Sequence, residues 1–402
     1  MNKQTSNLTD LYEKYILGNY PVPPFTLVKG QGTKVWDDTG KEYLDFGTGI
    51  AVNCLGHCHP YWVKRIQEQA TELIHCTNLY RFPQPAQLAE KLAKHTGPGK
   101  FFFCNSGAEA NEALIKLARL YGTDKAGEEG KSYKIIGAEN AFHGRTFGGM
   151  SATPLEKIQK GFRPLLDGFS FGEINNLESF SSKIDDQTVA IYLEPTQGES
   201  GVLPCTPEFL QGIRKLCDEH NLLLMLDEVQ TGVGRTGRFF GYEHAGIVPD
   251  AIAMAKGLGG GFPVGAIWIS DKYAGLFTPG THGSTYGGNP LACTAALSVL
   301  EVIEKENLLD RVTESGNKLK ASLCKLADKY PQHIAEVRGQ GYLLGIGMKE
   351  EPTDFINSLF GKGLITVPAG ANTVRIYPPF NVSDDEIQSA LDILEQTLED
   401  LK

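Results

Sequence analysis

The stretch Leu222–Ala266 reads LLLMLDEVQTGVGRTGRFFGYEHAGIVPDAIAMAKGLGGGFPVGA. Its two apolar runs, Leu222–Leu226 and Ala251–Ala255, have the length and composition of buried strands in a parallel sheet. Each run is followed by a charged residue, Asp227 after the first and Lys256 after the second. Ligands of open α/β sheets bind at the carboxyl ends of the strands. The sequence therefore predicts that a carboxylate and an ammonium meet at one reaction centre.

An acid and a lysine placed in this way suit the chemistry of pyridoxal 5'-phosphate (PLP). The amine of Lys256 would form a Schiff base with the aldehyde of the cofactor. Asp227 would hold a proton on the pyridine nitrogen, which keeps the ring an electron sink. The glycines that follow Lys256 let the backbone pass close to a flat cofactor. The alternative, for either residue taken alone, is a solvated charge at the end of a strand.

The same stretch contains a G-x-G-x-x-G pattern, Gly232–Gly237, which is typical of dinucleotide-binding folds. Such a site needs a helix directly after the glycines, and residues 238–246 show no helical period. A nicotinamide cofactor is therefore not expected here.

Composition excludes several classes of function. The chain has 402 residues and a net charge of −10, and it contains no run rich in Lys and Arg. Nucleic acid and anionic membrane are therefore not expected as partners. The N-terminus has no apolar signal region, and no apolar run has the length of a membrane span. We expect a cytoplasmic protein.

The eight cysteines are scattered, and no C-x-x-C motif occurs, which favours a reducing compartment over a zinc or iron–sulfur framework. Cys54, His57, Cys58 and His59 lie close together and form a possible metal site. Their spacing fits none of the common ligand patterns, and Pro60 is typical of a first helical residue. No metal is expected.

Strands and helices alternate between about residues 100 and 300, which predicts an α/β fold with a mostly parallel sheet and helices on both faces. The expected strands are Phe101–Cys104, Lys134–Ile136, Val189–Leu193, Leu222–Leu226, Ala251–Ala255 and Ala266–Ile269. We divide the chain into an N-terminal segment (1–50) that joins the small domain, a large domain (51–300) that binds the cofactor, and a small α+β domain (301–402).

Outside the large sheet, the patterns predict a few further elements. Lys34–Trp36 and Glu42–Asp45 form a hairpin in the N-terminal segment. A last helix begins at Ser383 with Glu386 completing a capping box. The expected helices and strands after Pro290 are Leu291–Lys305, Leu308–Tyr330, Ile334–Arg338, Tyr342–Met348, Leu364–Val367 and Val374–Tyr377.

Four further motifs supply groups that such a site needs. The turn around Ser106 begins a helix, so its backbone N–H groups suit a phosphate. In the segment FHGRT, Phe142 can stack on a ring and Arg145 can grip a carboxylate. Glu199 follows another strand, and Arg375 is its expected ionic partner. The loop 281–290 is rich in glycine and hydroxyl residues. Each motif alone is also compatible with an ordinary turn, core or surface.

Taken together, these motifs resemble the class III aminotransferases, which have fold type I among PLP enzymes. The resemblance covers nearly the whole chain and rests on NSGAEANEALIK, FHGRT, EPTQGESG, LDEVQTGVGRTG, AKGLGGGFPVGA and HGSTYGGNPLA. It implies the catalytic residues Lys256 and Asp227. It implies cofactor contacts from Ser106, Gly107, Ala108, Phe142, Asp227, Glu228, Val229, Gln230, Lys256 and Thr285. It implies substrate contacts from Arg145, Glu199, Ser284, Arg375 and Tyr20. Thr285 would reach the other subunit of a homodimer with shared active sites.

One position bears on the substrate. Members of the class that act on free ornithine carry a tyrosine where this chain has Gly49, and a glycine leaves room for an acylated amino group. The resemblance therefore favours transfer of the terminal amine of N2-acetyl-L-ornithine to 2-oxoglutarate, which gives N-acetylglutamate 5-semialdehyde and glutamate in arginine biosynthesis. Succinyl-diaminopimelate, succinylornithine and 4-aminobutyrate remain alternative donors. An inactive relative that only binds ligands is the other alternative, but such proteins lose the lysine or the acid.

Overall fold

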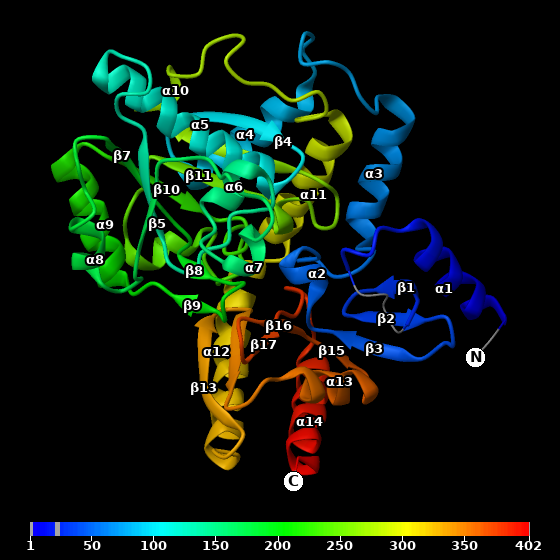
Figure 1. The fold of residues 1–402 in the computed structure, drawn as a ribbon. Helices are drawn as coiled ribbons and strands as arrows, with labels where there is room; N and C mark the ends of the chain where they lie inside the picture. Colours follow the sequence, from blue (N-terminus) through cyan, green and yellow to red (C-terminus); the bar gives the residue numbers. More distant parts are fainter. Residues whose placement is uncertain (1–2, 21–24, 402) are drawn as a thin grey trace.

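The computed structural model describes residues 3–20 and 25–401. Its centre is a seven-stranded sheet with the strand order β4-β12-β11-β10-β7-β5-β6. Figure 1 labels β4, β5, β7, β10 and β11 of this sheet. These strands are β4 (Gly99–Cys104), β5 (Lys134–Ala138), β6 (Phe169–Gly172), β7 (Thr188–Leu193), β10 (Leu223–Asp227), β11 (Ala251–Met254) and β12 (Gly265–Ser270). The expected α/β fold with a mostly parallel sheet is confirmed, and β6 is an additional strand.

Strand β12 is the exception, because it runs antiparallel to both of its neighbours. A parallel connection needs a crossover of about a dozen residues or more. The segment between β11 and β12 is shorter and contains only the 3-10 helix η2 (Lys256–Leu258). The chain therefore turns back directly after Lys256, and the glycine-rich loop stays at the end of the sheet.

Both faces of the sheet are covered, as a mostly parallel sheet requires. Successive strand residues alternate between two cores. Met225 of β10 packs with α5 (Gly107–Ala126), whereas Leu224 and Leu226 belong to the core on the opposite face. The helices of that opposite face are α4 (Pro83–Thr96), α9 (Pro207–His220) and α11 (Pro290–Lys305).

Helix α5 begins directly after β4 because Ser106 and Glu109 form reciprocal hydrogen bonds around its first turn. Ser106 is the N-cap and accepts a hydrogen bond from the backbone N–H of Glu109 at 3.2 Å. The Glu109 carboxylate in turn accepts from the N–H of Asn105 at 2.7 Å. These bonds fix the N-terminus of α5 at the carboxyl-end edge of the sheet.

The C-terminal part contains a four-stranded antiparallel sheet with the order β13-β14-β17-β16. Its strands are β13 (Ile334–Gln340), β14 (Leu343–Met348), β16 (Val367–Ala369) and β17 (Thr373–Ile376). Its helices are α12 (Leu308–Lys329), α13 (Thr353–Gly361) and α14 (Asp384–Asp400). The capping box of Ser383 and Glu386 at the start of α14 is confirmed.

The N-terminal hairpin shares a sheet with the C-terminal part (Figure 1). That sheet contains β1 (Leu27–Gln31), β2 (Lys34–Asp37), β3 (Glu42–Asp45) and β15 (Leu364–Ile365), and β15 pairs with β3 in parallel. The expected strand Leu364–Val367 is thus divided between two sheets. This sharing supports our division at residues 50 and 300, which remains a prediction.

Shorter elements complete the fold. They are α1 (Lys3–Tyr15), α2 (Thr48–Ala51), α3 (Pro60–Glu72), α6 (Phe147–Ser151), α7 (Glu156–Gln159), α8 (Leu177–Ser181), β8 (Thr196–Gln197), β9 (Leu203–Pro204), η1 (Gly241–Ala245) and α10 (Asp271–Ala274). Helix α1 had no expected counterpart. In the part of the chain that the structure describes, no helix is long and apolar enough to cross a membrane.

The glycine-rich loop at Gly232–Gly237 has a structural role. Arg235 in this loop is fully buried and donates to the backbone carbonyl of Pro378 at 2.6 Å and to that of Tyr342 at 3.3 Å. Its guanidinium also stacks on the ring of Phe380, 4.7 Å from the centroid. The loop therefore ties the large sheet to the C-terminal part.

Candidate active site

A cavity of about 440 Å³ opens at the carboxyl ends of β10 and β11. It is lined by ten of the predicted site residues, which come from segments far apart in the sequence. These are Ser106, Gly107, Ala108, Phe142, Arg145, Glu199, Asp227, Val229, Gln230 and Lys256. The prediction that a lysine and an acid meet at this edge of the sheet agrees with the structure.

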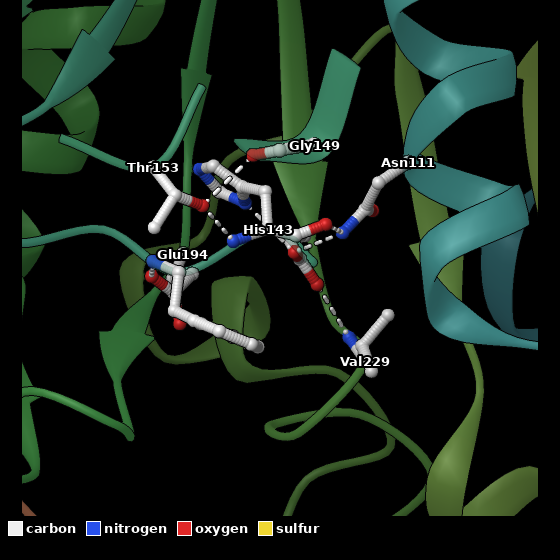
Figure 2. Close-up of polar contacts among 8 residues, drawn as sticks. Asn111, His143, Gly149, Thr153, Glu194 and Val229 are labelled. Atoms are coloured by element: carbon white, nitrogen blue, oxygen red, sulfur yellow. Dashed lines mark hydrogen bonds and ion pairs between the residues drawn. The ribbon is translucent and has the colours of Figure 1, made fainter. Parts of the chain in front are cut away.

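Asp227 is held by three hydrogen-bond donors. Its Oδ2 atom accepts from Asn111 Nδ2 at 2.7 Å and from His143 Nδ1 at 2.8 Å, and its Oδ1 atom accepts from the N–H of Val229 at 3.0 Å (Figure 2). A carboxylate has about four acceptor positions. One position on Oδ1 therefore remains for a further donor, which is the bond that a protonated ring nitrogen would make.

His143 is a functional residue that the sequence analysis left without a role. It lies inside the FHGRT motif, and its ring is stacked on Tyr192 with centroids 4.0 Å apart. The Nδ1 atom carries the proton, since a carboxylate such as Asp227 only accepts. Asn111 Nδ2 donates to Asp227 at 2.7 Å and to the His143 carbonyl at 2.8 Å, so it fixes the positions of these two residues relative to each other. These three side chains form one buried unit.

A second carboxyl group, Glu194, lies beside this unit. It follows β7 and accepts a hydrogen bond from the N–H of Phe142 at 3.0 Å (Figure 2). Burial raises the pKa of Glu194 well above its usual value, and the negative charge of Asp227 raises it further. Two acids close together in a buried site do not both ionise readily. Glu194 is therefore the member of the pair that holds a proton.

Lys256 is placed by a strained backbone. Its φ angle is +46°, in the left-handed region that residues other than glycine rarely adopt. The carbonyl of the next residue, Gly257, accepts from the Cys54 thiol at 3.2 Å. Burial lowers the pKa of the Lys256 ammonium, and the charge of Glu199 offsets part of this shift. The lowered pKa favours the neutral amine, which is the nucleophilic form.

The N-terminus of α5 closes one end of the cavity. Gly107 lies so close to Val229 that a Cβ atom there would be 2.8 Å from the valine methyl Cγ1. Backbone N–H groups of the first helical turn and the positive end of the helix dipole suit a phosphate. The hydroxyl of Ser106 is engaged with Glu109, so the backbone N–H groups are the freer donors at this end.

The opposite end contains an ion pair. Arg375 NH1 donates to Glu199 Oε1 at 2.7 Å, which is the pair that the sequence predicts. Gln230 Nε2 donates to the same oxygen at 3.1 Å. Burial works to raise the pKa of Glu199, but the charges of Arg375 and Lys256 outweigh it and the pKa is lowered. Arg145 is exposed at the mouth, 5.9 Å from the Phe142 ring centroid.

Five predicted residues do not line the cavity of this single chain: Arg375, which is paired with the lining residue Glu199, and Glu228, Tyr20, Ser284 and Thr285. The Glu228 carboxylate faces away and accepts from the N–H groups of Gly241 and Tyr242, both at 2.9 Å. This carboxylate supports the loop behind the site, and the contact between Glu228 and the cofactor stays a prediction. Tyr20 is 79% exposed and does not reach the mouth. Ser284 is bonded to Asn105 at 3.2 Å, and Thr285 is exposed.

Within residues 3–20 and 25–401, no group of three or more His, Cys, Asp or Glu side chains is arranged to hold a metal ion. His57, from the cluster considered above, bonds Asp45 at 2.8 Å instead.

Comparison with known proteins identifies the family. The family model for class III aminotransferases matches residues 16–398. The chain is a class III aminotransferase. The acetylornithine aminotransferase of Caldanaerobacter subterraneus subsp. tengcongensis is 48% identical to it over 97% of this chain and 98% of that protein. The acetylornithine aminotransferase of Methanocaldococcus jannaschii is 43% identical over 98% of this aminotransferase and 99% of its own length.

Solved structures agree with this assignment. The ornithine aminotransferase of Toxoplasma gondii ME49 superposes with a TM-score of 0.95 at 30% identity, and covers 99% of this chain and 96% of that one. The acetylornithine aminotransferase of Elizabethkingia anophelis gives a TM-score of 0.89 at 33% identity, with full coverage of both chains.

The cofactor of this aminotransferase is PLP, on which the class depends. The residues present fit it. Lys256 supplies the amine, Asp227 retains an acceptor position for the ring nitrogen, and the start of α5 suits the phosphate. Phe142 and Val229 line the space between these ends.

Proposed function

We propose that this aminotransferase transfers the terminal amine of N2-acetyl-L-ornithine to 2-oxoglutarate. The observation that carries the proposal is the ion pair between Arg375 and the cavity residue Glu199, at 2.7 Å, in which Arg375 is only 3% exposed. A terminal amine has no carboxylate on its reacting carbon, so an uncovered arginine there would attract the wrong end of the donor. The acetylornithine aminotransferases that resemble the chain at 41–48% identity support the same substrate.

The two half-reactions make different demands on the two arginines. When the donor's terminal amine is at the reaction centre, its distant carboxylate binds Arg145 at the mouth, and Glu199 covers Arg375. When 2-oxoglutarate reacts, one carboxylate lies on the reacting carbon and takes Arg375 through a bidentate bond. Glu199 must then swing away. Gly198 and Gly201 flank its short segment and give it that freedom.

The residues around the reacting bonds have separate tasks. Bound PLP supplies the electron sink and carries the amino group between the two substrates. Lys256 Nζ removes and returns the proton on the reacting carbon, because its lowered pKa leaves a free amine to act as a base. Asp227, oriented by Asn111 and His143, holds the proton at the ring nitrogen.

The donor's acyl group needs space near Gly49. This glycine lies in α2, whose residues Thr48, Gly49, Ile50 and Ala51 all have positive φ angles between 46° and 64°. The turn is therefore left-handed, which costs roughly 1–2 kcal/mol for each residue that is not glycine. It leads directly into Val52, which lines the cavity. A tyrosine side chain at position 49 would begin 3.7 Å from the Cβ atom of Val52, so its absence favours an acylated donor over free ornithine.

Removing Glu199 tests the switch. In Glu199→Ala, Arg375 would stay uncovered, so we expect the half-reaction with acetylornithine to slow by about 10- to 100-fold, equivalent to ~1.4–2.8 kcal/mol. The half-reaction with glutamate should be unchanged or faster. Stopped-flow measurement of each half separately decides between these outcomes. Equal slowing of both halves would mean that Glu199 has only a structural role.

A donor panel tests the substrate itself. Single-turnover rates with acetylornithine, succinylornithine, succinyl-diaminopimelate, free ornithine and 4-aminobutyrate, each followed by 2-oxoglutarate, give kcat/KM ratios that rank the donors directly. We expect acetylornithine to be preferred over free ornithine by at least about tenfold, a difference of ~1.4 kcal/mol. A higher kcat/KM for free ornithine or for 4-aminobutyrate would contradict the proposal.

We also propose a homodimer. Exposed apolar residues lie in the segment 73–80 and in the loop that contains Ser284 and Thr285. Asn78 Nδ2 joins this segment to this loop by donating to the Gly287 carbonyl at 3.1 Å. The exposed residues of this rim patch are Leu73, Ile74, Leu79, Tyr80 and Tyr286, with Leu79 at 86% and Tyr80 at 69%. Large apolar side chains gathered in this way mark an interaction surface. In such a dimer, Thr285 of one copy would contact the active-site cavity of the other copy.

Sedimentation tests the dimer. We expect the wild type to sediment at twice the chain mass of 43.9 kDa. Leu79→Asp should weaken association by at least about tenfold, because a charge would be buried in the interface. Val248→Asp is the matched control, since Val248 is an exposed apolar residue outside the rim patch. An active wild-type monomer would contradict the proposal.

A further inference from the structure

Tyr377 is a buried tyrosine that none of the roles above includes. It directly follows β17, two positions after Arg375, so the two side chains share a face of the strand. Its hydroxyl bonds Gln230 Oε1 at 3.0 Å. Its ring is fully buried in a small cluster with Ala51, Val202 and Leu343. The tyrosine therefore connects the C-terminal sheet to a residue that is expected to bind the cofactor.

The direction of these hydrogen bonds is determined by their partners. Glu199 is ionised, because its pKa is lowered, and a carboxylate only accepts. The bond from Gln230 to Glu199 must therefore use the amide nitrogen, which leaves Oε1 toward Tyr377. The Tyr377 hydroxyl is then the donor. The Arg375 guanidinium, 5.6 Å from the tyrosine ring centroid, only donates and so favours a hydroxyl proton that points away from it.

The surroundings of Gln230 leave its amide little freedom. Gly198 passes so close that a Cβ atom there would be 1.7 Å from Gln230 Oε1. Gln230 is itself nearly buried. When Glu199 leaves Arg375, the amide nitrogen of Gln230 loses its acceptor. Among the contacts that the structure describes, the bond from Tyr377 to the amide oxygen is then the remaining side-chain hydrogen bond of Gln230.

We propose that Tyr377 is a positioning residue that fixes the Gln230 amide with its nitrogen toward Glu199 and the cavity. In this orientation Gln230 helps to hold Glu199 over Arg375 during the first half-reaction. It also keeps an N–H donor available for the 3'-oxygen of PLP after Glu199 has moved. The inference deepens the proposed function and rests on it.

Tyr377→Phe removes the hydroxyl and retains the buried ring. The Glu199–Arg375 pair should then be held less firmly, so we expect the acetylornithine half-reaction to slow by about tenfold, while the glutamate half-reaction stays within about threefold of wild type. The pH titration of the visible absorbance of the lysine-bound cofactor should also shift, by about 0.5 pH unit or more, because the donor to its 3'-oxygen is no longer fixed.

Tyr43→Phe is the matched control. Tyr43 is also buried, and its hydroxyl donates to Asp37 at 2.8 Å in the N-terminal hairpin, away from the cavity. Both apoproteins should lose a similar amount of thermal stability, since each loses one buried hydrogen bond. Only Tyr377→Phe should alter the ratio of the two half-reactions and the absorbance titration. If Tyr43→Phe changes both in the same way, the proposal is overturned.

A double-mutant cycle with Glu199→Ala shows whether Tyr377 acts through Glu199. In the Glu199→Ala background, Tyr377→Phe should slow the acetylornithine half-reaction by less than about twofold, because the pair is already lost. Full additivity of the two effects would overturn the proposal, as would equal slowing of both halves with an unchanged titration. If no acylated donor is used at all, the proposed substrate is wrong, and the absorbance titration still tests Tyr377.

Discussion

Lys256→Ala should reduce turnover by at least about a thousandfold, which corresponds to ~4 kcal/mol of lost transition-state stabilisation. Lys256 both links the cofactor and moves the proton, so one substitution removes the nucleophile and the base together. Two features of the structure suit this lysine to both tasks. Its amine is buried and has a lowered pKa, and its backbone is held at a φ of +46°. Activity and the visible absorbance of the linked cofactor are the two measurements.

The cofactor should still bind to this variant without a covalent link. Its phosphate site at the N-terminus of α5 and its ring-nitrogen partner Asp227 do not depend on Lys256. Equilibrium dialysis or fluorescence with PLP measures this residual binding. Lys325→Ala, on the exposed side of α12, is the control and should behave as wild type. Normal turnover by Lys256→Ala would remove the lysine from the mechanism.

Asp227→Asn should lower the rate of proton removal from the substrate by about 100- to 10,000-fold, or ~3–5 kcal/mol. Asparagine has nearly the same shape but no charge to hold a proton on the ring nitrogen. It also places an amide beside His143 Nδ1 and Asn111 Nδ2, which both donate to the wild-type carboxylate. The Val229 N–H donates to the other carboxylate oxygen, so whichever way the amide is turned, at least one of the three donors would lose its acceptor, and we also expect a lower thermal midpoint.

Single-turnover measurement with a donor deuterated at the reacting carbon isolates this step. Proton removal should become fully rate-limiting in Asp227→Asn, so the isotope effect should rise together with the loss of rate. The contradicting result is a single-turnover rate in Asp227→Asn equal to that of the wild type. Glu194 provides an internal comparison, because its raised pKa already keeps that neighbouring acid protonated and Glu194→Gln should cost far less than Asp227→Asn.

The sequence alone was sufficient for the elements whose cause is local. The apolar runs ending at Asp227 and Lys256 became β10 and β11, each within one residue of the expected bounds. The Ser383 capping box was correct because its two bonds join residues three apart. The cavity also followed from order along the chain, since the ends of neighbouring strands meet at one edge of the sheet. The Glu199–Arg375 pair was found from charge balance, because a buried acid requires a cation.

Tertiary structure alone decided which side chains meet across long separations. His143 and Asn111 lie 84 and 116 residues from Asp227, and Tyr377 lies 147 residues from Gln230. His143 and Asn111 stand inside the motifs FHGRT and NSGAEANEALIK, but nothing local shows which side chain either of them bonds. Glu228 shows the converse case, because it follows Asp227 in the same motif but points elsewhere. Successive residues at a strand end point in opposite directions. The Glu228 carboxylate therefore bonds a loop behind the site and does not face the cavity. Local sequence determined the elements and their order. The packing of α5, β7, β10 and β17 around one edge of the large sheet determined which side chains form hydrogen bonds. The reason is that hydrogen-bond geometry depends on how whole elements are placed against each other.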